Sequence, residues 1–291
     1  MTRPQGFTLI ELAIVLVIVT ILIGGLAVPL SAQIQARRIA ETRADMQAIH
    51  DALMGYAMSH YITPPSCTCN YDASGVFQSG TSCTETRLCP LTSTANASFS
   101  PIRHYLPCPD APNDGNPLTT NDDDGIEETR NASSGDCPLS RGGLPWATLG
   151  VKGQDAWGNR YTYAVTRAFA NDKVGFTSMP DAAMSSASGT PGDLNVYPDS
   201  TCGTALVSDL PVIVVSHGAN GRGAQNANGG TPLAPASVAA DERQNLAVGS
   251  LPCASPQKFV SHNPTEDFDD LVTWLSRNEL FNRVCPSGGC P

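Results

Sequence analysis

The pattern of apolar and polar positions divides the chain into a long N-terminal helix and a body of short strands. Residues 7–28 form an apolar run that contains a single charged residue, Glu11. As an α-helix this run is roughly 33 Å long, which matches the hydrocarbon core of a membrane, about 30 Å thick. We therefore predict a transmembrane helix over residues 7–29, preceded by a short polar leader at residues 1–6.

A second helix is predicted over residues 30–62, where the pattern becomes amphipathic. Its apolar stripe recurs every three or four residues, at Met46, Ile49, Leu53, Tyr56 and His60. We expect this stripe to pack on the body of the same chain. We interpret His50 and His60, which both lie on this helix, as structural residues.

The junction between the two helices carries Gly24, Gly25 and Pro29. Glycine loosens a helix, and proline removes a backbone hydrogen bond from it. The sequence therefore predicts a kink or a melted turn near this point.

The body, residues 63–291, shows strand patterns separated by turn-forming residues. Residues 161–165 alternate as a strand does, directly after a Gly-Asn turn, and residues 211–215 are typical of a central strand. The 26 glycines and 23 prolines of the chain indicate many loops. We predict an α+β fold. Its long N-terminal helix, with a transmembrane half and an amphipathic half, packs on an antiparallel sheet with disulfide-rich loops.

The cysteines indicate an oxidising compartment, because their number is even and high for a chain of 291 residues. The ten candidates for disulfide bonds are Cys67, Cys69, Cys83, Cys89, Cys108, Cys137, Cys202, Cys253, Cys285 and Cys290. The first four begin a cysteine-rich insertion at about residues 67–140, and they lack the paired spacing of a zinc site. Proximity favours Cys108–Cys137 and Cys285–Cys290, and the remaining connectivity stays open.

The charge of the chain is acidic, with 17 basic and 27 acidic residues and a formal net charge of −10. This balance argues against a broad basic face and therefore against a nucleic-acid partner. Residues 121–128 combine carboxylates with a turn-forming glycine, as Ca²⁺ requires, but they lack the EF-hand spacing. The segment is interpreted either as a solvated acidic turn or as a calcium site with Asp122, Asp124 and Glu127 as ligands. No other cofactor is expected.

No catalytic motif is found in the sequence. The glycine-rich loop at residues 218–223 lacks the lysine and hydroxyl residue of a phosphate-binding loop. Ser216 and His217 are adjacent in a predicted strand, so their side chains point to opposite faces and do not form a nucleophile–base pair. We therefore predict that the protein is not an enzyme.

Glu11 needs a reason, because a carboxylate within an apolar helix is costly. One interpretation places it near the membrane interface, where it is protonated or reaches polar headgroups. A second interpretation applies if the chain is cut between Gly6 and Phe7. The new α-amino group then lies one helical turn from Glu11 and within reach of Glu11 in a neighbouring subunit.

The segment Gly6-Phe7-Thr8-Leu9-Ile10-Glu11, followed by the apolar run, resembles the type IV pilin and pseudopilin superfamily. The resemblance implies that prepilin peptidase cuts after Gly6 and that Phe7 is then methylated. It associates Glu11 with methylation and with filament assembly. The implied partners are other pilin or pseudopilin subunits and an inner-membrane assembly platform.

The resemblance also implies a location. The chain would cross the bacterial inner membrane once, with its leader in the cytoplasm and its C-terminal domain in the periplasm. After assembly it would be part of a periplasmic or cell-surface filament. The cysteines agree with a periplasmic body.

Part of the body is similar to the G-type pseudopilin of type II secretion. The matching positions are Asp155, Trp157, Gly158, Asn159, Tyr161, Tyr163, Ser216, Gly218, Ala219 and the segment 269–274. The resemblance implies a shared architecture. That family binds calcium after its Ser-x-Gly-Ala motif through an aspartate whose place is taken here by Asn220.

We expect a structural subunit of a type IV pilus or of a type II secretion filament. Its size and cysteine content favour a minor pilin or pseudopilin over the bulk subunit. The alternative is a binding module at the tip of a pilus, an adhesin or a DNA-uptake receptor, for which the pilin helix is only a mount.

Overall fold

The computed structural model describes residues 8–62, 67–69, 72–76, 97–99, 102–111, 123–178, 189–224, 239–246, 251–265 and 267–285. For residues 22–30, 67–69 and 97–99 it describes the backbone alone. Several predicted sites therefore lie outside the described residues, namely the leader, Gly6, Phe7, Cys83, Cys89, Asp122 and Cys290. The predicted domain boundaries stay predictions.

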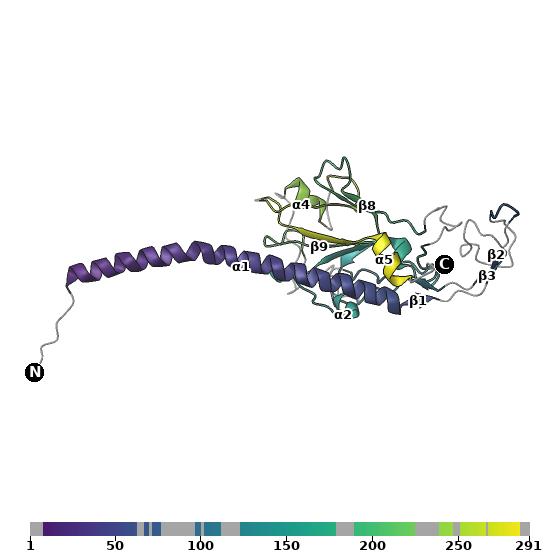
Figure 1. Cartoon of the computed structure of the whole chain (residues 1–291), viewed down its shortest axis with the longest axis horizontal. Coiled ribbons are helices and arrows are strands. Elements are labelled where there is room, and N and C mark those ends of the chain that lie inside the picture. The colour runs from purple at the N-terminus through teal and green to yellow at the C-terminus, as the bar shows by residue number, and fades with distance from the viewer. Residues whose placement is uncertain are drawn as a thin grey trace, which may run out of the picture.

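The longest element is α1 (Leu9–Ser59), a single helix of 51 residues. Figure 1 shows it as one gently curved rod whose N-terminal half projects beyond the body. The predicted melted turn is wrong, because the helix runs without a break through Gly24, Gly25 and Pro29. A long helix can absorb a proline by bending, since only one backbone hydrogen bond is lost.

The side chains of α1 form two zones. Residues 8–21 are exposed, whereas Met46, Ile49 and Leu53 are at most 4% exposed and share a core cluster with Tyr163. In the part of the chain that the structure describes, no helix contains a stretch both long and apolar enough to cross a membrane.

A four-stranded antiparallel sheet forms the centre of the body, in the order β11-β9-β6-β5. Its strands are β5 (Arg141–Gly143), β6 (Thr162–Val165), β9 (Val212–Ser216) and β11 (Leu271–Leu275). Val214 pairs with Tyr163 on one side and with Thr273 on the other. The alternating and the wholly apolar segments of the sequence are therefore neighbouring strands of this sheet.

A second sheet has three strands in the order β10-β7-β8. These are β7 (Leu194–Tyr197), β8 (Val207–Leu210) and β10 (Lys258–Val260). The pair β10–β7 is parallel, a pairing that the sequence did not predict. Ala164, Ile213 and Val215 form a second core cluster with this sheet. Strands β6 and β9 are therefore buried on both faces, which explains the continuous apolar character of β9.

Smaller elements complete the body. Two antiparallel pairs join β1 (Tyr61–Ile62) to β4 (Arg103–His104) and β2 (Cys67–Cys69) to β3 (Ala97–Phe99). The short helices are α2 (Trp146–Leu149), α3 (Arg167–Ala170), α4 (Ala240–Gln244) and α5 (Arg277–Val284).

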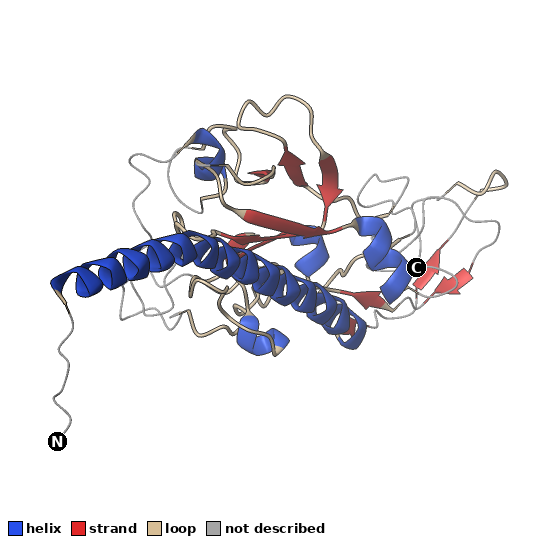
Figure 2. Cartoon of the chain, turned by 60° about the vertical axis from the view of Figure 1, so that its left-hand side comes forward, coloured by secondary structure: helices blue, strands red, loops and turns tan. Residues whose placement is uncertain are grey.

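Helix α5 lies beside the C-terminal half of α1 (Figure 2). His50 Nε2 is 3.3 Å from a Glu279 oxygen on α5, and the ring of His60 stacks on Tyr56 at 3.8 Å between centroids. Both histidines thus make intramolecular contacts, as expected for structural residues.

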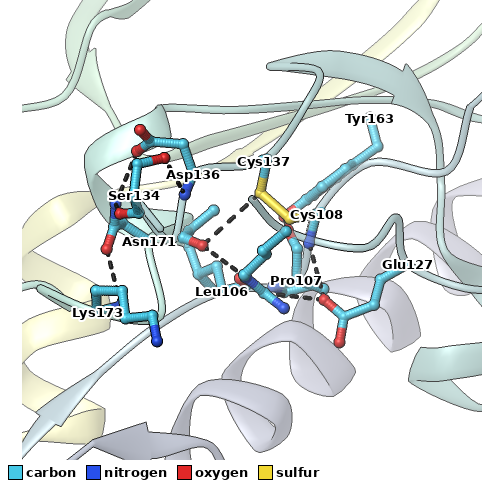
Figure 3. The surroundings of a disulfide bond; sticks show 12 residues. Leu106, Pro107, Cys108, Glu127, Ser134, Asp136, Cys137, Tyr163, Asn171 and Lys173 are labelled. Atoms are coloured by element: carbon cyan, nitrogen blue, oxygen red, sulfur yellow. Dashed lines mark hydrogen bonds and ion pairs between the residues drawn. A yellow bond between two sulfur atoms is a disulfide. The ribbon is translucent and has the colours of Figure 1, made fainter. Parts of the chain in front are cut away.

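Two disulfide bonds are described in full. Cys108–Cys137 was predicted from proximity and is confirmed, with Cα atoms 5.5 Å apart (Figure 3). Cys202–Cys253, with Cα atoms 5.8 Å apart, was not predicted. Cys285 is also disulfide-bonded, but its partner lies outside the described residues, so pairing with Cys290 stays a prediction. No cysteine side chain that the structure describes is a free thiol.

Candidate functional site

The first turn of α1 fixes the carboxylate of Glu11. The backbone N–H and the hydroxyl of Thr8 donate to Glu11 Oε2 at 2.9 and 2.8 Å, and Glu11 N donates to Thr8 Oγ1 at 3.4 Å. This reciprocal pair is a capping box, which satisfies donors that the helix start leaves free. The carboxylate is thereby held beside Thr8. Thr8 directly follows Phe7, whose α-amino group would become a cation after a cut behind Gly6.

The helix surface that follows Glu11 is apolar on all sides and exposed. After Glu11, the large apolar side chains range from 43% exposed at Val19 to 68% exposed at Ile21. The body of the same chain does not cover these residues. An apolar surface of this extent marks contact with lipid or with other proteins.

The C-terminal end of α1 is tied to the disulfide-closed segment through Glu127. Tyr56 Oη donates to Glu127 Oε1 at 2.6 Å, and Cys108 N donates to Oε2 at 3.1 Å. Arg130 Nη2 lies 2.9 Å from the same Oε2. Both carboxylate oxygens of this predicted calcium ligand are therefore engaged by protein donors.

Among the described residues, Asp124, another predicted ligand of the acidic segment, does not form a metal-binding group with Glu127. Asp124 Oδ1 accepts a hydrogen bond from Ile126 N at 2.8 Å, which closes a local turn. Within the described residues, a single group of at least three potential metal-ligating side chains occurs, and it lies elsewhere. Asp122 lies outside the described residues, so a calcium site that includes it stays a prediction.

The turn before β6 brings distant polar residues together. Asp155 Oδ1 accepts from the backbone N–H of Trp157 and Asn159 at 2.9 Å each, while Asp155 Oδ2 accepts from Ser216 Oγ at 2.7 Å. Asn159 Nδ2 donates to the carbonyl of Gly218 at 3.0 Å. The Asp155 carboxylate thus locks the turn to the end of β9. Burial raises its pKa.

Ser216 and His217 have different partners, as expected for adjacent residues at the end of a strand. The Ser216 hydroxyl is used by Asp155, whereas His217 Nε2 lies 2.8 Å from Thr162 Oγ1. Both residues are fully buried. His217 is therefore not paired with the Ser216 hydroxyl.

A buried carboxylate cluster lies beyond the end of β9. It consists of Glu242 on α4 and of Asp269 and Asp270, which precede β11, and one carboxylate oxygen of each lies within 4.8 Å of the others. Asn220, in the loop after β9, donates from its backbone to Asp269 Oδ2 at 2.9 Å and from its side chain to Glu242 Oε1 at 2.5 Å. The cluster therefore joins three segments that are distant in the sequence.

The cluster has unsatisfied acceptors. Among the described residues, Glu242 Oε2, Asp269 Oδ1 and Asp270 Oδ1 have no hydrogen-bond donor. Arg222 Nη1 is 3.5 Å from Glu242 Oε2, and His217 Nδ1 is 3.6 Å from Asp270 Oδ1. Burial raises the pKa of Glu242 and of Asp269. Carboxylate oxygens in this arrangement suit a hard cation such as Ca²⁺.

This cluster was missed in the sequence. Glu242 and Asp269 are 27 residues apart, and neither has the spacing of a known metal motif. The usable signal was the resemblance that directs attention to the loop after Gly218, together with the acidic residues before Trp274. The aspartate that the resemblance places in that loop is replaced here by Asn220, and the third carboxylate of the cluster comes from α4.

The N-terminal segment is the part of the chain that comparison with known proteins identifies. Residues 1–27 match the family model described as the prokaryotic N-terminal methylation motif. No curated protein and no solved structure matches the chain. The match covers the predicted cleavage site and the first part of α1. The chain therefore begins with a prepilin-type segment of the type IV pilin and pseudopilin kind.

Proposed function

We propose that this protein is a structural subunit, a minor pilin or pseudopilin, of a type IV pilus or of a type II secretion filament. The observation that carries the proposal is the methylation motif at residues 1–27, which leads directly into an exposed apolar helix. Prepilin peptidase cuts after Gly6, and Phe7 becomes the methylated N-terminal residue.

Before assembly, the apolar segment anchors the protein as a single transmembrane helix in the bacterial inner membrane. Residues 7–29 supply the span, and the body lies in the periplasm. Support for this location comes from the disulfide bonds, which persist in oxidising compartments. The C-terminal half of α1 rests on the central sheet and carries the body.

During assembly, the apolar helix exchanges lipid for the helices of other subunits. The carboxylate of Glu11 then pairs with the α-amino group of Phe7 in a neighbouring subunit. The capping box supports this step, because it keeps Glu11 at the start of the helix. Pairing sets the axial position of each subunit, and the assembly platform of the inner membrane supplies subunits one at a time.

The N-terminus of the mature protein tests this proposal. Mass spectrometry of protein from cells that contain prepilin peptidase should show a chain that begins at Phe7 and carries one added methyl group. Cells without the peptidase should retain the chain from Met1. An uncut chain in the presence of the peptidase contradicts the proposal.

We propose no catalytic activity for the body. Its buried polar residues serve as structural connections, as with Asp155 and Ser216, which link a turn to β9. A non-enzymatic subunit agrees with the methylation motif.

A second candidate is a binding module at the pilus tip. The observation that favours it is the position of β2 and β3, which lie at the end of the molecule opposite the N-terminus (Figure 1). Both strands belong to the cysteine-rich insertion. Deletion of residues 67–99 should abolish attachment but spare filaments if binding is the purpose. A tip protein is present in a few copies per filament, and a shaft subunit in many.

We also propose that Ca²⁺ binds the buried carboxylate cluster of Glu242, Asp269 and Asp270. The support is the set of three acceptor oxygens without a donor. The ion supplies positive charge that offsets the repulsion among the carboxylates. It would join α4 to the segment before β11 and so stabilise the body.

A further inference from the structure

A groove of about 590 Å³ lies between α1 and the second sheet. One wall comes from Arg43, Met46 and Gln47 on α1. The other wall is the loop of residues 261–264 after β10, together with Pro198 and Leu206. The floor is formed by residues 270–273, at the start of β11.

The floor of the groove is the free edge of a strand. β11 pairs with β9 on one side, and in the described part of the chain its other side makes no backbone hydrogen bond. Leu271 belongs to the core cluster that contains α1 residues, whereas Val272 packs against the cluster of the second sheet. Since residues from both faces of β11 line the same groove, the groove follows the edge of the strand and not one of its faces.

The walls restrict what can reach this edge. An added strand lies about 4.8 Å from its neighbour. Residues of α1 and the loop of residues 261–264 line the groove along this edge, so a single extended chain reaches the edge more readily than a strand that belongs to a folded sheet. A free chain segment is therefore favoured over the sheet edge of another folded domain. β-Strand addition of this kind uses backbone hydrogen bonds for affinity and side-chain pockets for specificity.

The charge of the groove indicates one feature of its occupant. Arg43 is exposed, and it forms no ion pair with any residue that the structure describes. Of the other groups at the groove, His262 Nε2 is 3.3 Å from Asp241 Oδ2. Asp270 is 3% exposed; its Oδ2 accepts from Asn245 Nδ2 at 2.9 Å, and its Oδ1, which has no donor, is buried with it. The available charge is therefore the Arg43 guanidinium, which suits an acidic side chain.

We infer that the groove binds an extended peptide segment of another protein by strand addition to β11, with an acidic side chain of that segment paired to Arg43. The bound segment alternates its side chains between Met46 on the α1 wall and Leu206 on the opposite wall. The site belongs to the body, so the inference does not depend on filament assembly.

A defined peptide tests the inference on the full-length mature protein in detergent. The probe is a fluorescein-labelled acetyl-Thr-Val-Glu-Val-Thr-Val-amide, read by fluorescence anisotropy. Two comparison peptides carry lysine in place of glutamate, or a methyl group on every backbone nitrogen. We expect the glutamate peptide to bind and to slow amide exchange in residues 271–275. We expect the N-methylated peptide not to bind, because it cannot donate backbone hydrogen bonds.

A charge reversal checks the role of Arg43. Arg43→Glu should weaken the glutamate peptide roughly fivefold and should favour the lysine peptide instead. The matched control is Arg37→Glu, another exposed arginine of α1 that does not line the groove, and it should leave both affinities unchanged. No binding of the glutamate peptide, equal binding of the N-methylated peptide, or equal effects of the two reversals would overturn the inference.

Discussion

Tyr56 on α1 donates a 2.6 Å hydrogen bond to Glu127, which belongs to the segment closed by the Cys108–Cys137 disulfide. This bond links the helix to the body through a carboxylate that Arg130 and a backbone amide also hold. Tyr56 is 5% exposed, and burial together with Glu127 raises its pKa. The phenol therefore remains a donor throughout the physiological range.

Replacing Tyr56 with phenylalanine should destabilise the protein. Tyr56→Phe removes the donor but leaves the ring in place, so we expect a loss of about 1–2 kcal/mol in the free energy of unfolding. Denaturant titration in detergent measures this loss. Tyr61→Phe is the control, because Tyr61 is 54% exposed, and it should change little. Equal stability of Tyr56→Phe and the wild type would show that the bond to Glu127 adds nothing.

The Glu11 carboxylate should be needed for assembly and not for membrane insertion. Glu11→Ala should leave the protein in the membrane fraction but absent from sheared filaments, because the neighbouring α-amino group loses its partner. Thr8→Ala removes the side-chain hydroxyl of the capping box and keeps the carboxylate. That variant should still enter filaments. If both variants fail equally, Glu11 acts by capping its own helix.

Calcium should stabilise the protein through the buried carboxylate cluster. At a concentration about 100 times the dissociation constant, a bound ligand adds about 2.7 kcal/mol, which corresponds to a rise of roughly 5 °C or more in Tm. Thermal unfolding with calcium and with a chelator measures the shift. Glu242→Gln should abolish it, and Glu279→Gln, on α5 outside the cluster, should retain it. A wild-type Tm unaffected by calcium would refute the site.

Asp110 should make stability depend on pH. Burial, the largest cause, and neighbouring acidic residues raise its pKa to about 7. The folded state therefore keeps a proton that the unfolded state releases at lower pH, so stability falls as pH rises from about 4 to about 7. Asp110→Asn should flatten this part of the profile. Unfolding titrations at a series of pH values test it, with Asp51→Asn, which is 61% exposed, as a control that keeps the slope.

Loss of the Cys202–Cys253 disulfide should weaken both the fold and the carboxylate cluster. The bond closes a segment that includes β9 and α4, with a sequence separation of 51. In the chain-entropy model a loop of this size contributes about 4 kcal/mol. The double variant Cys202→Ser, Cys253→Ser should therefore unfold at a lower temperature and respond less to calcium. An unchanged calcium response would show that α4 is positioned without this disulfide.

The parts of the fold that the sequence predicted are those with local signals. The apolar stripe from Met46 to Tyr56 predicted the helix on which it lies, because residues three and four positions apart share a face of a helix. Strands β6 and β9 follow from their apolar patterns, and Cys108–Cys137 follows from proximity. Each of these predictions depends on residues that are close in the sequence.

The missed features depend on contacts between distant segments. The parallel pairing of β10 with β7 joins Lys258 to Asn195, and no local pattern marks that register. The carboxylate cluster needs Glu242 from a short helix whose place is set by the surrounding loops. Pro29 was misleading for another reason, because a long helix continues past a proline by bending where the backbone hydrogen bond is lost.

The unbroken course of α1 has a geometric consequence for a filament. From Glu11 to Arg43 the helix advances 32 residues. At about 100° per residue, this rotation is roughly 40° short of nine full turns. Glu11, near the start of α1, and Arg43, at the groove, therefore lie on nearly the same side of the helix. The direction in which Glu11 faces a neighbouring subunit therefore also sets, to within about 40°, the direction in which the groove faces. The packing of the helices in the filament core then decides on which side of the subunit the edge of β11 is presented.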